Sequence, residues 1–172
     1  TVRIDRLISE FLAFARPAPP DLQPLRPAEL IERVLAVCEP QLAKAGVRTT
    51  LTLDAPEALI RGDERQIHAA LLNLILNAID AMPDGGRLEL RQRADATSVC
   101  IEVEDSGPGI AAEDVEHVFD PFFTTKAQGT GLGLAKAYST MEGHGGSIEY
   151  LGTEGRGALF RLTFPRWHGG GS

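Results

Sequence analysis

D105-S-G-P-G109, F119-D-P-F-F-T-T-K126 and G129-T-G-L-G-L134 are three motifs that follow one another within thirty residues of this chain. The first follows an apolar segment, residues 99–103, which we expect to be a strand with Glu102 pointing outward. A carboxylate at the end of a buried strand needs a donor, because an unpaired buried charge is strongly unfavourable. The glycines of the first motif leave room for a flat group to approach the backbone. The three motifs together indicate a binding site.

The glycine cluster at residues 129–133 indicates what this site binds. It opens a helix expected from Gly131 to Glu142, and free N–H groups at the start of a helix can hold phosphate. The Asp105 carboxylate can accept a hydrogen bond from the amino group of adenine, whereas it would repel the carbonyl of guanine. A flat base and an anion describe a nucleotide, with ATP favoured over GTP. The alternative is that Asp105 merely caps the turn that follows it.

A second expected helix, from Ile67 to Met82, is apolar on almost every face and should be deeply buried. Asn73 and Asn77 are four residues apart, so they lie on one face of this helix. Buried amides usually have partners, and the neighbouring sequence offers none. A side-chain carbonyl oxygen suits Mg²⁺, which also binds substrate phosphates, and Asn77 is therefore the predicted metal ligand. Asn73 is predicted on the phosphate side of the site, with a helix-packing amide as the alternative.

Together these segments carry a family resemblance. Q66-I-H-A-A-L-L-N-L-I-L-N-A-I-D-A-M82 resembles the N box of bacterial sensor histidine kinases, and the three motifs above resemble their G1, F and G2 boxes. The F and G2 boxes are most similar to the nitrogen-regulation type of sensor kinase. The resemblance covers roughly residues 21–166. It implies the Bergerat ATP-binding fold, which is shared with gyrase, MutL and the large heat-shock chaperones.

The resemblance also implies that the ligands are ATP and Mg²⁺. The implied ATP-binding residues are Asn73, Asn77, Asp105, Gly107, Gly109, Ile110, Phe119, Thr125, Lys126, Gly129, Thr130, Gly131, Leu132, Gly133 and Leu134, with Asn77 as the metal ligand. Lys126 is expected to reach the terminal phosphates, with a solvated lysine as the alternative. Asp80 stands where many relatives have a basic or aromatic residue, so no phosphate contact is expected there. Ala158 replaces a frequent threonine, which removes a hydroxyl from the surroundings of Asp105.

Sensor kinases phosphorylate a histidine in an H-E-x-x-[NP] setting on a helical dimerisation domain. None of the four histidines, His68, His117, His144 and His168, is followed by an acidic residue, and we expect His144 to serve a turn. The resemblance therefore implies a catalytic domain that donates the γ-phosphate to a histidine outside this chain. No catalytic residue is predicted here, and no autophosphorylation of the isolated chain is expected.

Two other classes of function stay open. One is an ATPase of the gyrase or MutL kind, but those proteins place a catalytic glutamate four residues before the metal asparagine, where this chain has Asn73. The other is a degenerate module that serves only nucleotide binding or protein–protein recognition.

The hydrophobic pattern predicts a two-layer α/β sandwich, a mixed β-sheet with helices on one face. Expected are a helix from Glu29 to Lys44, ended by Gly46, with Leu30, Val34, Val37 and Cys38 inward; strands at 47–53, 87–93, 98–104, 147–151 and 158–164; and a short helix at 112–118. Asp63 is the expected N-cap of the asparagine-bearing helix. Residues 28–166 form the predicted ATP-binding domain, and residues 167–172 a linker-like tail, interpreted as an artificial extension.

Residues 1–16 contain an amphipathic helix (Thr1–Ala15) and are predicted to be the end of a dimerisation and phosphotransfer helix. The alternative is a helix folded back on the domain. Residues 17–27 are a proline-rich linker, since proline cannot continue a helix. The unpaired apolar face of the helix predicts weak homodimerisation. The other expected partners are the upstream dimerisation domain and a cognate response regulator.

Composition limits the remaining partners. The net charge of −7, from 24 acidic and 17 basic residues, argues against binding to nucleic acid. The sequence shows neither a membrane span nor a signal peptide, so we expect a cytoplasmic domain without direct membrane contact, and leave open whether the parent protein is anchored. Cys38 and Cys100 lack metal or redox spacing and are predicted to be buried reduced thiols.

Overall fold

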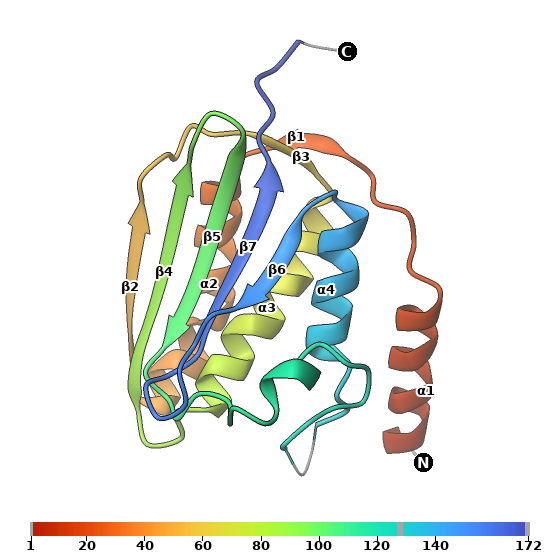
Figure 1. Cartoon of the computed structure of the whole chain (residues 1–172), viewed down its shortest axis with the longest axis vertical. Coiled ribbons are helices and arrows are strands. Elements are labelled where there is room, and N and C mark those ends of the chain that lie inside the picture. Colours follow the sequence, from red (N-terminus) through yellow and green to blue (C-terminus); the bar gives the residue numbers. More distant parts are fainter. Residues whose placement is uncertain (1, 127–128, 171–172) are drawn as a thin grey trace.

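The computed structural model describes residues 2–126 and 129–170. One sheet contains β2 (Val47–Leu53), β4 (Gly86–Ala94), β5 (Ser98–Asp105), β7 (Leu159–Pro165) and β6 (Ser147–Tyr150), in that spatial order. β2 and β4 are parallel, and the other neighbours are antiparallel. Helices α2 (Pro27–Ala45), α3 (Glu64–Asp80) and α4 (Gly133–Gly143) cover one face of this sheet (Figure 1). The predicted two-layer sandwich with a mixed sheet is confirmed.

Alternation along the central strands separates the two faces of the sheet. Ile101 and Val103 are buried in the core with the helices, whereas Glu102 between them points to the helix-free face. The outward direction was predicted, but Glu102 is only 4% exposed, because Arg91, Arg93 and Arg161 surround its carboxylate at 3.2, 3.3 and 2.9 Å. Burial disfavours the charge on Glu102, but the hydrogen bonds from Arg161 and Arg91 outweigh burial and lower its pKa.

Helix α2 begins at Pro27, where the missing N–H costs nothing, and ends at Gly46, whose φ of 71° is left-handed. Leu30, Val34 and Cys38 are buried as predicted. The prediction for Val37 is wrong: it is 53% exposed, because it lies just outside the stripe that those residues form along the helix.

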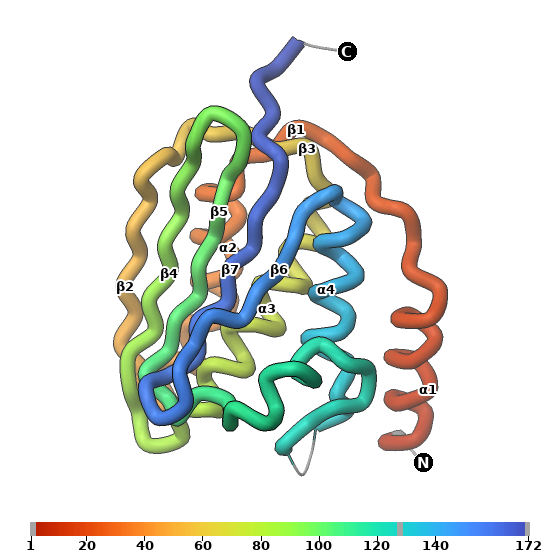
Figure 2. Tube along the Cα trace, viewed as in Figure 1, coloured from red at the N-terminus to blue at the C-terminus, as the bar shows by residue number. Residues whose placement is uncertain are grey.

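The proline-rich segment before α2 contains a strand that the sequence did not reveal. Here β1 (Gln23–Leu25) pairs antiparallel with β3 (Ile60–Gly62) in a small second sheet. A three-residue strand with a central proline, Pro24, carries no period that would identify it. Helix α1 (Val2–Ala15) stands apart from the sandwich, beside α4, at the end of the extended linker (Figure 2).

Helix α1 lies against α4, and its Phe11 stacks on Phe122 with ring centroids 5.8 Å apart. Ile4, Ile8 and Leu12 stay exposed. The assignment of residues 1–16 to a dimerisation helix and the expected self-association stay predictions, and Thr1 lies outside the described residues.

Several boundaries differ from expectation. The short helix predicted at 112–118 is reduced to a 3₁₀ helix, Val115–His117, and α4 begins at Gly133, two residues later than predicted. Cys38 is buried, but Cys100 is half-buried on the helix-free face, where its Sγ lies 3.5 Å from Thr163 Oγ1.

The start of the predicted tail is bonded to the domain, since the backbone N–H of Trp167 donates to the carbonyl of Leu59 at 2.8 Å. Residues 171 and 172 of this tail lie outside the described part of the chain. No helix in the described ranges is long and apolar enough to cross a membrane.

Candidate functional site

Asp105 is the last residue of β5, and the alternation of the strand points it into the core beside the helices. Its side chain is 7% exposed. One oxygen, Oδ1, accepts hydrogen bonds from the backbone N–H groups of Gly107 at 2.9 Å and Ala158 at 3.3 Å. Burial raises the pKa of Asp105, and these two bonds oppose the rise. Among the described residues no donor reaches the second oxygen, Oδ2, so one side of this buried carboxylate is free for a ligand.

The glycines after Asp105 are needed by the packing of the protein itself. A Cβ on Gly107 would lie 2.9 Å from the carbonyl oxygen of Ala81, just after α3. Gly109 has a φ of 74°, and its Cβ would lie 2.8 Å from the carbonyl oxygens of Gly157 and Thr153. The space that we expected beside these glycines is filled by backbone in the Cβ direction, so close loop packing explains why glycine stands there.

The end of this turn is held by β6. The backbone N–H of Ile110 donates to the hydroxyl of Tyr150 at 2.9 Å. Tyr150 is not among the predicted residues, because a contact between residues 40 positions apart leaves no trace in local spacing.

Asn77 lies on α3, half-buried, and its amide oxygen has a cationic partner. The ammonium of Lys126 donates to Asn77 Oδ1 at 2.7 Å and to Asp80 Oδ2 at 2.8 Å. The lysine and the aspartate are both well exposed, so this ion pair contributes only about 0–1 kcal/mol to stability. The structure therefore places a positive charge at the oxygen that the sequence predicted as a metal ligand.

Asn73, one turn earlier on α3, faces α4. Its Nδ2 donates to the carbonyl of Gly133, the first residue of α4, at 3.4 Å. This contact matches the helix-packing alternative that the sequence left open. Next to it, Leu132 is buried, Leu134 packs against the core, and the hydroxyl of Thr130 accepts a hydrogen bond from the N–H of Leu132 at 3.4 Å.

The second and third motifs are tied to each other before α4. The N–H of Phe122 donates to the carbonyl of Gly131 at 2.8 Å, and the N–H of Gly129 donates to the carbonyl of Lys126 at 3.3 Å. Phe122 has a φ of 68°, a strained value for a residue with a side chain, and Gly131 also has a positive φ of 75°.

Of the other predicted residues in this loop, Phe119 packs against the rings of Tyr138 and Phe160, with centroids 5.5 and 6.1 Å away. Thr125 is exposed. Residues 127 and 128, between the two motifs, lie outside the described residues.

The three motifs thus meet at the C-terminal half of α3, the helix that carries the fourth motif, the segment at residues 66–82 that resembles the N box. Gly107 of the first lies against Ala81, Lys126 of the second bonds to Asn77, and Gly133 of the third bonds to Asn73. The C-terminal ends of α3 and β5 and the start of α4 lie at the lower end of the molecule in Figure 1. This end carries a buried carboxylate, an amide oxygen holding a cation, and the first turn of a helix, which can together bind a base, a metal ion and phosphates.

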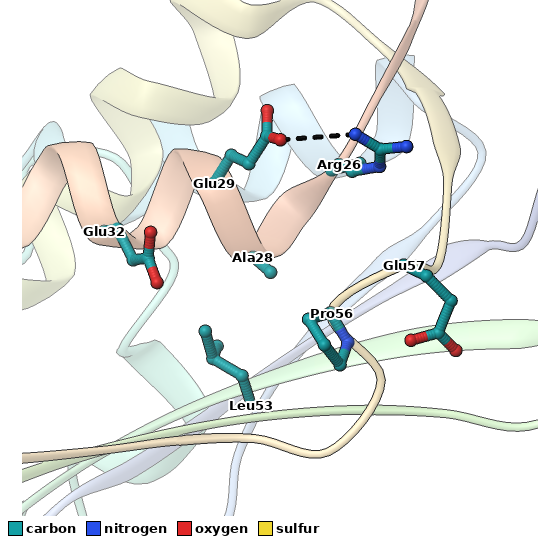
Figure 3. Close-up of a pocket in the computed structure, with 7 residues that line it drawn as sticks. All are labelled: Arg26, Ala28, Glu29, Glu32, Leu53, Pro56 and Glu57. Carbon is teal, nitrogen blue, oxygen red and sulfur yellow. Dashed lines mark hydrogen bonds and ion pairs between the residues drawn. The ribbon is translucent and has the colours of Figure 1, made fainter.

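Two cavities in the described part of the chain are not centred on these residues. One, of about 880 Å³, lies between α1 with its linker and helices α3 and α4, and its wall includes Asn73. The other, of about 390 Å³, is a shallow acidic hollow between α2 and the β2–β3 loop, with the Arg26–Glu29 ion pair on its rim (Figure 3). Neither is lined by Asp105 or Asn77, so the side-chain chemistry, and not cavity size, identifies the site.

Comparison with known proteins gives consistent matches. Residues 62–168 match the family described as "Histidine kinase-, DNA gyrase B-, and HSP90-like ATPase". Over 163 residues, 95% of this chain, the sequence is 37% identical to the sensor histidine kinase ZraS of Escherichia coli O157:H7, of which it covers 36%. The chain thus spans about a third of the length of this curated relative.

Solved structures agree with the sequence matches. The nucleotide-free catalytic domain of histidine kinase ThkA superposes with a TM-score of 0.78 at 33% identity, over 84% of this chain and 95% of that one. Histidine kinase ThkA in complex with response regulator protein TrrA gives a TM-score of 0.82 at 28% identity, over 95% of this chain and 47% of that one.

Proposed function

Because this chain belongs to the histidine kinase-, DNA gyrase B- and HSP90-like ATPase family, as a catalytic domain of the sensor histidine kinase kind that binds ATP, we propose that its four motifs form the nucleotide site. One observation carries the proposal. Asp105 is buried, its Oδ1 is held by two backbone N–H groups, and no described residue donates to its Oδ2. No side-chain oxygen of the described residues is both fully buried and without a hydrogen-bond partner, so Oδ2 is reachable from outside and can accept a hydrogen bond from a ligand.

Asp105 would select the base. Its Oδ2 would accept a hydrogen bond from the amino group of adenine. Guanine would instead place a carbonyl oxygen against Oδ2, and two acceptors cannot form a hydrogen bond. The backbone bonds from Gly107 and Ala158 keep the carboxylate from turning away.

The residues around Asn77 fit a divalent cation. The Lys126 ammonium lies 2.7 Å from Asn77 Oδ1, which supports a cation-binding role for this oxygen, and the Asp80 carboxylate adds negative charge beside it. Asn77 would hold Mg²⁺. When bound, the ion would neutralise phosphate charge, and it needs few protein ligands because Mg²⁺ usually keeps several waters and binds substrate phosphates. Lys126, released from Asn77 and Asp80, would be free to contact the terminal phosphates.

The reaction of the whole protein would be transfer of the γ-phosphate of ATP to a histidine on a dimerisation domain outside this chain. Residues 1–16 would belong to that domain, and residues 17–27 would link it to the ATP-binding domain at 28–166. Response regulators are the partners to expect next, since the related ThkA is known in complex with TrrA. This chain would contribute positioning and charge stabilisation, which supply most of the catalysis in phosphoryl transfer. The nitrogen-regulation subtype stays a prediction.

The test is a calorimetric titration with ATP and with GTP, each in the presence and absence of Mg²⁺. We expect saturable binding of ATP that Mg²⁺ strengthens, and much weaker binding of GTP. No binding at millimolar ATP would contradict the proposal and favour a degenerate module.

A second assay separates the kinase from a hydrolase. The chain should show neither autophosphorylation nor steady-state ATP hydrolysis, since Asn73 stands where gyrase-type ATPases place their glutamate and its amide is bonded to Gly133. Measurable hydrolysis would favour the gyrase or MutL kind.

A further inference from the structure

Helices α3 and α4 lie side by side and run in opposite directions (Figures 1 and 2). At the end that carries the proposed nucleotide site, Asn73 of α3 bonds to the carbonyl of Gly133 of α4 at 3.4 Å. At the far end, the backbone N–H of Asp63, the N-cap of α3, donates to Nε2 of His144, the residue that follows α4, at 2.9 Å. The pair is therefore bonded once at each end, and buried Ala70 and Ala137 lie on the two helices between these bonds.

The hydrogen bonds of His144 define its tautomer. The ring is 7% exposed and meets Phe164 edge-on at 6.2 Å. Since Nε2 accepts from the N–H of Asp63, it carries no proton, so Nδ1 carries one and donates to the carbonyl of Thr140 at 2.7 Å. Each ring nitrogen thus bonds to a different helix, and the imidazole with its proton on Nδ1 makes both hydrogen bonds.

Asp63 makes this junction a meeting point of three segments. Its Oδ1 caps the first turn of α3 by accepting from the N–H groups of Arg65 at 3.0 Å and Gln66 at 3.2 Å. Its Oδ2 accepts from the N–H of Asp21 in the linker at 3.0 Å. Movement of His144 would therefore displace the N-terminus of α3 as well as the turn after α4.

We propose that His144 is a positioning residue for nucleotide binding. By joining the end of α4 to the N-cap of α3, it sets how far α4 extends along α3, and thereby where the first turn of α4 lies relative to Asn77. This inference rests on the proposed nucleotide site. The alternative, which the sequence suggested, is that His144 only closes the turn after α4. That role needs the Thr140 bond and makes the Asp63 bond incidental.

Two substitutions separate these roles, because each keeps one of the two bonds. In His144→Gln the amide oxygen can take the place of Nε2 and still accept from Asp63, while the bond to Thr140 is lost. In His144→Asn the shorter amide can still donate to Thr140, while the bond to Asp63 is lost.

We expect the glutamine variant to bind ATP with nearly the affinity of the wild type. The asparagine variant should bind about fivefold more weakly, as follows if the competent placement of α4 falls to about a fifth of the population. Equal affinities for both variants, or weaker binding by the glutamine variant, would overturn the inference.

Gln92→Met is the matched control for lost stability. Gln92, on β4, is fully buried and also makes two hydrogen bonds. It donates to the carbonyl of Ala55 at 2.8 Å and accepts from the N–H of Ala55 at 3.2 Å, and Ala55 lies in the loop after β2, remote from α4. Titrations run well below the melting temperature of all variants should leave the affinity of this control unchanged. If it loses as much affinity as His144→Asn, the effect is general destabilisation and the inference fails.

Amide hydrogen exchange without nucleotide gives an independent reading. Exchange in the first hydrogen-bonded turn of α4, residues 136–139, should be faster in His144→Asn than in His144→Gln, although the substitution lies at the opposite end of the helix; this turn begins with the bond from the N–H of Lys136 to the carbonyl of Leu132 at 2.8 Å. Equal exchange would contradict the inference even if the wild type binds no ATP. Absence of ATP binding by the wild type would instead count against the proposed function alone.

Discussion

Substitution of Asp105 by asparagine isolates the oxygen that we assign to adenine. An asparagine of the same shape can keep its carbonyl oxygen in the place of Oδ1, where the N–H groups of Gly107 and Ala158 donate at 2.9 and 3.3 Å. The reversed orientation would set an NH₂ group against two donors, so it is disfavoured. The NH₂ group therefore replaces Oδ2, and the exchange alters only the face that points to the ligand.

The size of the effect follows from the chemistry of that face. The adenine amino group loses a hydrogen bond to a charged acceptor, worth about 1.5–3 kcal/mol, which corresponds to a dissociation constant roughly 10- to 150-fold higher. Stability should not fall in parallel. Burial raises the pKa of Asp105 in the folded protein, so the ionised carboxylate is disfavoured by folding at neutral pH, and a neutral amide removes that penalty.

The assay pairs a calorimetric ATP titration with urea denaturation of the same samples. We expect Asp105→Asn to lose affinity while its free energy of unfolding stays equal or rises. Glu104→Gln is the matched control, since Glu104 is the preceding carboxylate on β5 but points outward and pairs with Arg91 at 2.8 Å. An unchanged affinity in Asp105→Asn would refute the assignment of Oδ2 to adenine, and equal losses in both variants would show a general effect of charge.

Three further predictions address other parts of the molecule. Lys126→Met should change the free energy of unfolding by less than about 1 kcal/mol, because its ion pair is exposed, while ATP·Mg²⁺ binding weakens about fivefold or more in a titration; unchanged affinity would exclude a phosphate contact. Glu102→Gln should lower the free energy of unfolding in urea by about 1.5–3 kcal/mol, since three arginines lose a charged hydrogen-bond partner, with the exposed Glu39→Gln on α2 as control. ATP affinity should fall as the pH is lowered through the raised pKa of Asp105, because protonation removes the acceptor. The free energy of unfolding should show the opposite trend, because the stabilising contribution of the neutral carboxyl is present at low pH and lost as the pH rises through that pKa. Asp105→Asn should flatten both profiles, and a variant profile parallel to the wild type would assign the pH dependence to another group.

Local patterns were sufficient wherever a residue's role depends on its neighbours in sequence. The N-cap at Asp63, the end of α2 at Gly46 and the inward residues of β5 were all predictable, because capping and alternation act over a few residues. The predictions failed where a local rule was marginal. Val37 lies at the edge of its helical stripe, and β1 is too short to show a period.

The sequence alone predicted the three helices that cover the sheet, the five strands of the main sheet, the sandwich and the four motifs, since periodicity and motif spacing are properties of neighbouring residues. Only the tertiary structure decided which residues of those motifs bond to distant parts of the chain. The N–H of Ala158 donates to one oxygen of Asp105, 53 residues away. Lys126 donates to Asn77, 49 residues away, and the N–H of Asp63 donates to His144, 81 residues away. Such pairings depend on how helices and loops pack in three dimensions, and the spacing of residues along the chain does not specify that packing.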